Sequence, residues 1–209
     1  MRVLLFGLSA NPPTGMAGHA GLVRWAVNRE VHPEMEGPLN ALWVMPVFRH
    51  AFGDKREMVP FAHRMAMAKL AFEGLSTERV PVEVKDVEHR VYHRLRRAGE
   101  DEPLVGTIDV VRALQVEHPG IQLGLLLGAD TFRDLQAGRW KSSAELLRQV
   151  KVVVVPRVGV DLSVPRPDGP ALGPISSSAL RGTQDPAIWA AALQPQVWAY
   201  VQTHHLYGF

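Results

Sequence analysis

Five short apolar runs, separated by segments with helical spacing, constrain the fold of this chain more than any other feature of its sequence. The runs cover residues 2–6, 41–47, 82–87, 121–127 and 151–155. Strands that alternate with helices favour a parallel sheet with right-handed crossovers and helices on both of its faces. The last two runs are almost wholly apolar, which is typical of strands buried on both faces. The sequence therefore predicts an α/β fold with a Rossmann-like parallel sheet.

The segments between the runs predict the helices and the domain organisation. Helical spacing marks residues 18–27, 61–72, 107–118, 131–136 and 144–150. Residues 156–174 carry five prolines and three glycines, so we expect an extended loop that is too short to separate domains. A chain of 209 residues buries about 70% of its unfolded surface as one unit. We expect a single domain over residues 1–209, with a small helical C-terminal extension at 175–209.

Composition excludes several classes of protein. The absence of cysteine removes disulfides, thiol catalysis and cysteine-ligated zinc. A net charge of +2, from 23 basic and 21 acidic residues, does not supply the basic face of a nucleic-acid binder. No apolar run approaches membrane-spanning length, and the first residues do not form a signal peptide. We expect a cytoplasmic protein without nucleic-acid or membrane partners, whose ligand is a small anion.

One basic stretch calls for an interpretation of its own. It contains two histidines and four arginines, with Tyr92 as the only interleaved aromatic residue: His89, Arg90, His93, Arg94, Arg96 and Arg97. A single aromatic residue makes no stacking platform for nucleotides. We interpret the stretch as a solvated flap between a strand and a helix.

The loop after the first run carries the first candidate site. Residues 7–22 read GLSANPPTGMAGHAGL, in which Gly7 permits a tight turn and Ser9 and Asn11 offer hydrogen bonds. His19 stands at the start of a helix, where backbone N–H groups and the helix dipole favour phosphate oxygens. The loop lacks both the Walker lysine and the GxGxxG pattern. A histidine that only caps its own helix is the alternative interpretation.

A second candidate anion site lies near the end of the chain. Residues 175–181 read ISSSALR, which places serine hydroxyls at a helix start and Arg181 within reach of the same anion. Serine-rich caps are common, so the segment alone is also consistent with a simple N-cap. Two such helix starts, one after the first strand and one after the last, together suit a polyphosphate at the edge of the sheet.

These segments resemble the nucleotidyltransferase superfamily with the HxGH and ISSTxIR signatures, and most closely the bacterial nicotinate-nucleotide adenylyltransferases. The resemblance runs nearly end to end, through MPVFRHAFGDK and AHRMAMAKLA (45–71), GTIDVVRAL (106–114), GADTFRDL (128–135), VVVPRVG (153–159) and QPQVWAYVQTHHLY (194–207). It implies adenylyl transfer from ATP to nicotinate mononucleotide, which forms deamido-NAD and pyrophosphate without a covalent intermediate. Mg²⁺ bridging the ATP phosphates is implied as well, with no metal ligands from the protein.

The resemblance also implies roles for individual residues. His19, Lys55 and Arg181 would be catalytic. The ATP-binding set would be Gly7, Leu8, Ser9, Thr14, Gly18, Asp130, Ser176, Ser177 and Ser178, and the mononucleotide would contact Ser9, Asn11, Thr107, Trp140 and Arg157. Three of these residues have simpler interpretations: Lys55 as a solvated loop lysine, Asp130 as a helix N-cap and Trp140 as a core residue.

Departures from the family pattern leave alternatives open. The first histidine of HxGH is missing: Thr14 follows NPP where it would be expected, two extra residues precede AGH, and Met16 or Thr14 stands in its place. Threonine donates a neutral hydrogen bond but carries no charge. Val105 and Gly106 replace an expected serine and tyrosine on the pyridine side. The alternative functions are a nicotinamide-mononucleotide or pantetheine-phosphate adenylyltransferase and a non-catalytic nucleotide-binding regulatory module; a homo-oligomer also stays open.

Overall fold

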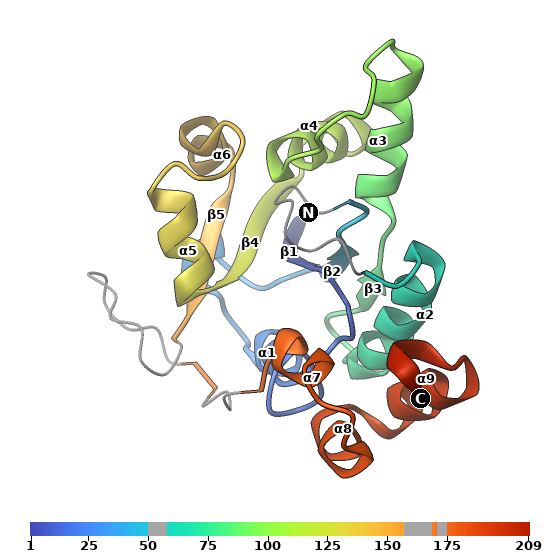
Figure 1. The fold of residues 1–209 in the computed structure, drawn as a ribbon. Coiled ribbons are helices and arrows are strands. Elements are labelled where there is room, and N and C mark those ends of the chain that lie inside the picture. Colours follow the sequence, from blue (N-terminus) through green and yellow to red (C-terminus); the bar gives the residue numbers. More distant parts are fainter. Residues whose placement is uncertain (50–57, 157–168, 171–174) are drawn as a thin grey trace.

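A computed structural model describes residues 1–49, 58–156, 169–170 and 175–209 of the chain. In this part of the chain, five parallel strands form one sheet in the order β3-β2-β1-β4-β5 (Figure 1). The strands are β1 (Arg2–Leu8), β2 (Ala41–Pro46), β3 (Val82–Val84), β4 (Gln122–Gly128) and β5 (Lys151–Val155). The predicted α/β fold with a parallel sheet is confirmed.

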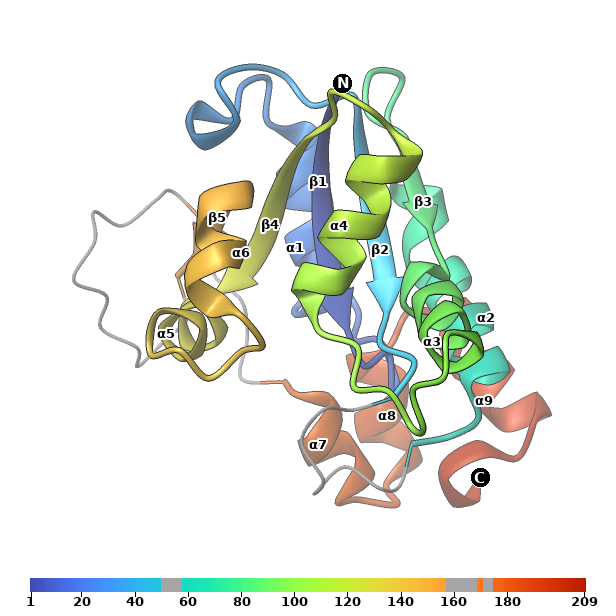
Figure 2. The same cartoon turned by 90° about the horizontal axis from the view of Figure 1, so that it is seen from above.

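Helices cover both faces of the sheet. Figure 2 shows α3 and α4 in front of the strands and α1 and α2 behind them. The helices are α1 (His19–Asn28), α2 (Phe61–Phe72), α3 (Val87–Arg97), α4 (Thr107–Glu117), α5 (Ala129–Gln136), α6 (Ser143–Gln149), α7 (Ser177–Arg181), α8 (Pro186–Ala192) and α9 (Pro195–Thr203), with 3-10 turns η1 (Pro33–Met35), η2 (Glu73–Leu75) and η3 (Leu206–Gly208). No helix in the described part of the chain is long and apolar enough to cross a membrane.

The strands are apolar because each contributes side chains to two hydrophobic cores, one on each face of the sheet. Successive side chains of a strand point to opposite faces. In β1, Leu4 and Phe6 join the cluster beneath α1 and α2, whereas Val3 and Leu5 join the cluster beneath α3, α4 and α6. A run of apolar residues without polar alternation is therefore what this architecture requires.

The basic stretch at residues 89–97 corrects one sequence-based interpretation. It is not a solvated flap but most of helix α3, and the third strand ends at Val84 rather than at residue 87. Val87, Val91 and Tyr92 are buried against the sheet, and these positions recur at helical spacing. Charged residues fill the opposite face of α3, which obscures the apolar stripe in the sequence.

The C-terminal segment packs into the same core as the first strand. Trp189 of α8 is fully buried, and it shares a hydrophobic cluster with Val197 and Val201 of α9 and with Leu4 of β1. Helix α9 lies against α2 (Figure 1). Residues 175–209 are thus joined to the sheet by apolar burial, which brings the end of the chain beside the loop that follows β1.

A buried arginine ties together the carboxyl ends of β1 and β2. Arg64, on α2, is only 2% exposed. Its guanidinium donates hydrogen bonds to the carbonyl oxygens of Ser9 (3.0 Å), Phe48 (2.9 Å) and Val59 (3.0 Å), and to that of Val47. A buried cation is tolerated when its donors are satisfied in this way. One side chain therefore fixes the backbone of three separate segments.

Glu88 binds the N–H groups of the segment after β2 whose carbonyl groups Arg64 binds. One oxygen of its carboxyl group accepts hydrogen bonds from the backbone N–H groups of Phe48 (2.8 Å) and Arg49 (3.4 Å). Burial raises the pKa of Glu88 from 4.5 to about 7, although those two N–H groups and the nearby charge of Arg64 favour the ionised form. Residues 47–49 are thus held at their carbonyls by a guanidinium and at their amides by a carboxyl group.

Stability should depend on pH through Glu88. Because the neutral carboxyl group is favoured in the folded chain, folding takes up a proton between pH 4.5 and pH 7. The contribution of Glu88 to stability is complete below its pKa in the unfolded chain and is lost as the pH rises through 7. Its loss lowers the free energy of unfolding by about 2 to 3 kcal/mol between pH 4.5 and pH 7. We expect Glu88→Gln to remove this slope, measured by urea unfolding at half-unit pH steps from 5 to 7.5.

Glu83→Gln is the matched control. Hydrogen bonding from Lys85 lowers the pKa of Glu83, so this carboxyl group is already ionised across the same window. The control variant should keep the wild-type slope between pH 5 and 7.5. An identical pH dependence in wild type and Glu88→Gln would contradict the assignment of the proton to Glu88.

Candidate active site

A cavity of about 640 Å³ opens where the strand order reverses. The chain moves outward from β1 to β2 and β3, then returns to place β4 on the other side of β1. The loops after β1 and β4 therefore diverge at the carboxyl edge of the sheet, which is where ligands bind in open α/β folds. The cavity is lined by these loops, by residues just after β5 and by the starts of α1, α4 and α7.

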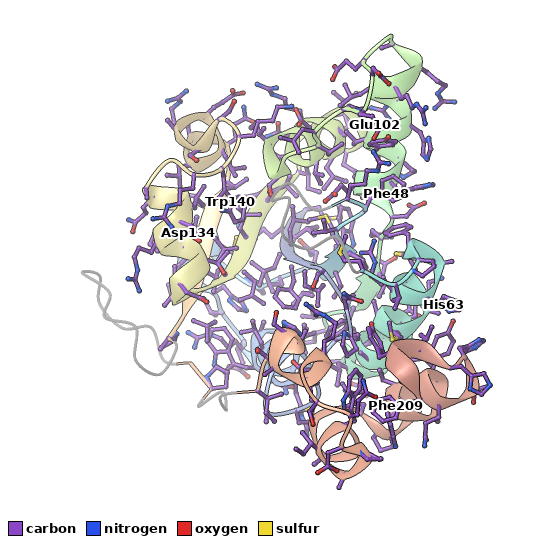
Figure 3. The ribbon with its side chains drawn as sticks, in the orientation of Figure 1. Phe48, His63, Glu102, Asp134, Trp140 and Phe209 are labelled. Atoms are coloured by element: carbon purple, nitrogen blue, oxygen red, sulfur yellow. The ribbon has the colours of Figure 1, made fainter. Side chains whose placement is uncertain are left out.

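The cavity brings together every sequence-predicted site residue that the structure describes. These residues are Gly7, Leu8, Ser9, Asn11, Thr14, Gly18, His19, Thr107, Asp130, Trp140, Ser176, Ser177, Ser178 and Arg181. Lys55 and Arg157 lie outside the described residues. In Figure 3, Trp140 and Asp134, which line the cavity, lie by α5, while Phe48 and Glu102, which do not line it, lie across from them by α3.

The β1–α1 loop is held by hydrogen bonds to segments far away in the sequence, and Asn11 accepts several of them. Asn11 is 1% exposed. Its side-chain oxygen accepts hydrogen bonds from the Tyr207 hydroxyl (2.8 Å) and the Val59 N–H group (3.3 Å). Its carbonyl oxygen accepts one from Arg181 (2.6 Å). Burial raises the pKa of the Tyr207 phenol, so that group stays a donor at neutral pH.

Helix α1 offers its histidine ring to the cavity, whereas its first N–H groups are used locally. The Gly18 N–H donates to the Gly15 carbonyl (2.9 Å), the His19 N–H to the Thr14 hydroxyl (2.9 Å) and the Ala20 N–H to the Thr14 carbonyl (3.1 Å). The expectation that these backbone groups are available to a phosphate is therefore wrong for residues 18–20. The side chain of His19 also lines the cavity from this helix start.

Helix α7 is docked onto the same loop. The Ser176 hydroxyl caps it by accepting the Ala179 N–H (3.1 Å), and the Ser177 hydroxyl donates to the Pro12 carbonyl (2.8 Å). The guanidinium of Arg181 donates to the Asn11 and Ser177 carbonyls and reaches the Ser178 hydroxyl at 3.4 Å. His19 and Arg181 thus line one cavity, although 162 positions separate them in the sequence.

The charge on the cavity wall is uneven. Three lining cations are paired with carboxylates, namely Arg49 with Glu102, Arg139 with Asp134 (2.7 Å) and Lys141 with Asp109 (2.8 Å). Among the described residues, no carboxylate forms a salt bridge with Arg181, whose acceptors are neutral carbonyls and a hydroxyl. In the part of the chain that the structure describes, the positive charge available to an anion is therefore concentrated at Arg181 of α7.

The polar residues on the other walls occupy helix starts. Asp130 is in the first turn of α5, but the N-cap of that helix is Gly128, so the interpretation of Asp130 as an N-cap is wrong. Thr107 is the first residue of α4. Trp140 is partly buried against the hydrophobic cluster beneath α4 and also lines the cavity, so it is in part a core residue, and its role toward the mononucleotide stays a prediction.

Sequence reasoning missed three residues that organise the site, namely Arg64, Glu88 and Tyr207. A signal for Arg64 was present, because the buried positions of α2 are 64, 67, 68, 71 and 72. An arginine in an otherwise apolar helical stripe must find internal acceptors. Glu88 and Tyr207 carry no comparable signal, since their partners are backbone and side-chain groups far away in the sequence.

Comparisons with known proteins agree with this geometry. Residues 11–183 match the family model described as cytidylyltransferase-like. A probable nicotinate-nucleotide adenylyltransferase of Myxococcus xanthus is 29% identical over 210 residues, covering 100% of this chain and 95% of that protein. Another, of Chloroherpeton thalassium, is 32% identical over 161 residues, covering 71% and 73%.

A solved structure supports the fold. It is nicotinic acid mononucleotide adenylyltransferase of Plasmodium falciparum complexed with NaAD, with a TM-score of 0.73, 18% identity and coverage of 100% of this chain and 98% of that one. At this identity the likeness concerns the fold alone. The family model spans most of the chain, and the resemblance identified in the sequence is confirmed. The chain belongs to the cytidylyltransferase-like family, in which its relatives are nicotinate-nucleotide adenylyltransferases.

Proposed function

We propose that this protein transfers the adenylyl group of ATP to nicotinate mononucleotide, in the cytoplasm, as a step of NAD biosynthesis. The observation that carries the proposal is the convergence of His19 and Arg181 on one cavity at the switch point of the sheet. The names of the relatives support the choice of substrates. Together these findings favour an enzyme over a regulatory module that only binds nucleotide.

The reaction needs positioning and charge neutralisation more than proton transfer. An oxygen of the mononucleotide phosphate forms a bond to the α-phosphorus of ATP, while the bond between that phosphorus and the oxygen of the leaving pyrophosphate breaks. The attacking phosphate is already ionised at neutral pH, so no general base is required. Donors and cations that hold the phosphates in line are sufficient for catalysis of this kind.

The two phosphate-facing groups have different tasks in this proposal. The His19 ring donates a hydrogen bond to an oxygen of the triphosphate, and it retains that contact as charge shifts toward the leaving group. Arg181 holds the departing β and γ phosphates, because its guanidinium offers several donors and a charge that no described carboxylate neutralises. Lys55, with a bridging role between the two substrates, stays a prediction from the sequence.

The remaining walls suit the two nucleosides. Asp130, in the first turn of α5 after β4, would accept hydrogen bonds from ribose hydroxyls of ATP. Thr107 and Trp140 also line the cavity, where an indole ring offers a stacking surface to a pyridine ring. Ser9 and Asn11 line the cavity from the β1–α1 loop. Arg157 stays a prediction for the mononucleotide.

Magnesium is compatible with this donor set only as an ion carried by the triphosphate. In the described part of the chain, no group of three or more His, Asp or Glu side chains could hold a metal ion. Mg²⁺ commonly keeps several waters and binds substrate phosphates rather than an all-protein cage. When bound, it would neutralise charge on the triphosphate.

Replacement of His19 by alanine should lower kcat by about 100- to 1000-fold, because a donor that acts on developing charge is lost. The KM for ATP should change much less, since most of the binding contacts remain. Initial rates of pyrophosphate release measure both parameters. His204→Ala, at the exposed end of α9, is the control and should behave as wild type. Near-normal turnover of His19→Ala would refute the catalytic role of the ring.

The choice of mononucleotide is tested by initial rates with nicotinate and nicotinamide mononucleotide side by side. We expect kcat/KM to be higher by at least about tenfold for nicotinate mononucleotide, which corresponds to about 1.4 kcal/mol of differential transition-state binding. A higher value for the nicotinamide substrate would assign the enzyme to the other pyridine nucleotide. Binding of ATP without pyrophosphate release, with either substrate present, would favour a regulatory module.

A further inference from the structure

The first histidine of the HxGH pattern is absent from this chain, and the contacts of the residues in its place can be described. Met16 stands in its place by spacing from His19, and Thr14 by its position after the two prolines; Met16 is 45% exposed, whereas Thr14 is 1% exposed. Gly18 makes the close approach between the loop and α1 possible, because a Cβ atom at that position would lie 2.2 Å from the Thr14 hydroxyl. A glycine is therefore needed where the threonine side chain meets the helix start.

Three hydrogen-bond contacts join Thr14 to His19. The Thr14 backbone N–H donates to Nδ1 of the imidazole (3.1 Å), and the Thr14 hydroxyl lies 3.0 Å from the same nitrogen. The His19 backbone N–H donates to the Thr14 hydroxyl oxygen (2.9 Å). The two residues thus bind each other through both backbone and side-chain groups.

These contacts determine which ring nitrogen carries the proton. A backbone N–H group can only donate, so Nδ1 must accept, and a neutral imidazole then has its proton on Nε2. The Thr14 hydroxyl oxygen already accepts from the His19 N–H, which leaves its own hydrogen to be donated to Nδ1 as well. Every contact is consistent with one arrangement of protons.

We propose that Thr14 is a positioning residue that holds the His19 ring in the Nε2–H tautomer and so presents an N–H donor to the triphosphate. The proposal rests on the function proposed above, since it assigns to His19 the contact with ATP. In this arrangement His19 acts as a neutral donor, and among the described residues the positive charge of the site comes from Arg181. A threonine can therefore stand where the family has a histidine, because its task is to orient and not to add charge.

A purely structural cap is the competing explanation for the same contacts. The Thr14 hydroxyl satisfies the first N–H group of α1, and loss of such a cap destabilises a protein by about 1 kcal/mol without further consequence. The two explanations differ in one respect. Only a positioning role makes the effect of Thr14 on turnover depend on the presence of the His19 ring.

The kinetic test is a double-mutant cycle with Thr14→Val and His19→Ala. Thr14→Val should lower kcat by about 10- to 100-fold with the KM for ATP nearly unchanged, because a small misplacement of a catalytic group has an effect of this size. In the His19→Ala background, the same substitution should change kcat by less than about twofold. Thr14→Ser should recover at least about a third of the wild-type kcat, since its hydroxyl can make the same bonds.

Thr183→Val is the matched control for capping. The Thr183 hydroxyl accepts the Asp185 N–H (3.2 Å) near the start of α8, and Thr183 does not line the cavity. Its removal should leave kcat unchanged. Equal losses of kcat from Thr14→Val in the wild-type and His19→Ala backgrounds would reduce Thr14 to a structural cap and overturn the proposal.

A spectroscopic test does not require turnover. Long-range proton–nitrogen correlation spectra of the ligand-free wild-type protein report which nitrogen of His19 is protonated. We expect the Nε2–H form in wild type and also in Thr14→Val, because that variant keeps the backbone N–H that donates to Nδ1 and loses only the contacts of the hydroxyl. A proton on Nδ1 in wild type contradicts the proposal. If the wild-type protein releases no pyrophosphate with any mononucleotide, the proposed function fails, while the spectra still decide the tautomer.

Discussion

The parallel pairing of β1 with both β2 and β4 is the constraint on which the rest of the structure depends. It forces the loops after β1 and β4 to leave the same edge of the sheet in different directions, and the cavity lies between them. The pairing is stabilised by apolar burial on both faces, at about 25 cal/mol per Å² of surface removed from water. The polar residues of the site are therefore held by elements whose own stability comes from the two cores.

A second set of interactions gives the β1–α1 loop its shape. Arg64 holds the Ser9 carbonyl, Arg181 holds the Asn11 carbonyl and Tyr207 binds the Asn11 side chain. These groups are buried or half-buried, so loss of any one of them would leave an acceptor without its partner in a poorly hydrated place. Tyr207 reaches Asn11 from a left-handed backbone conformation (φ 58°), which is unfavourable for a residue with a side chain. Residues near the end of the chain thus take part in fixing the conformation of the β1–α1 loop.

Local patterns predicted most of the architecture, because strand burial and helix amphipathicity leave periodic signals. The strand at 151–155 and the helix at 61–72 have the predicted bounds. Helix α3 was missed because its buried face has few apolar residues, and its many charges are typical of a solvated loop. The residues that converge on the cavity were found because short polar motifs follow the strands at their carboxyl ends.

Contacts without periodicity could not be predicted. The hydrogen bond between Tyr207 and Asn11 joins residues 196 positions apart in the sequence. The hydrogen bonds between Thr14 and His19 depend on a turn whose conformation no sequence pattern predicts. The same turn uses the first N–H groups of α1, which general reasoning about helix starts assigned to the ligand. The types of the side chains predicted where the site would lie. Which acceptor each N–H group binds could be seen only in the structure.

The central claim is that two groups from opposite ends of the chain hold one triphosphate. A crystal structure of the protein with a non-hydrolysable ATP analogue tests it most directly. The account predicts that Nε2 of His19 and the guanidinium of Arg181 both lie within about 3.5 Å of triphosphate oxygens in the cavity beside β1 and β4. A triphosphate bound elsewhere, or one that leaves either group without contact, would contradict it.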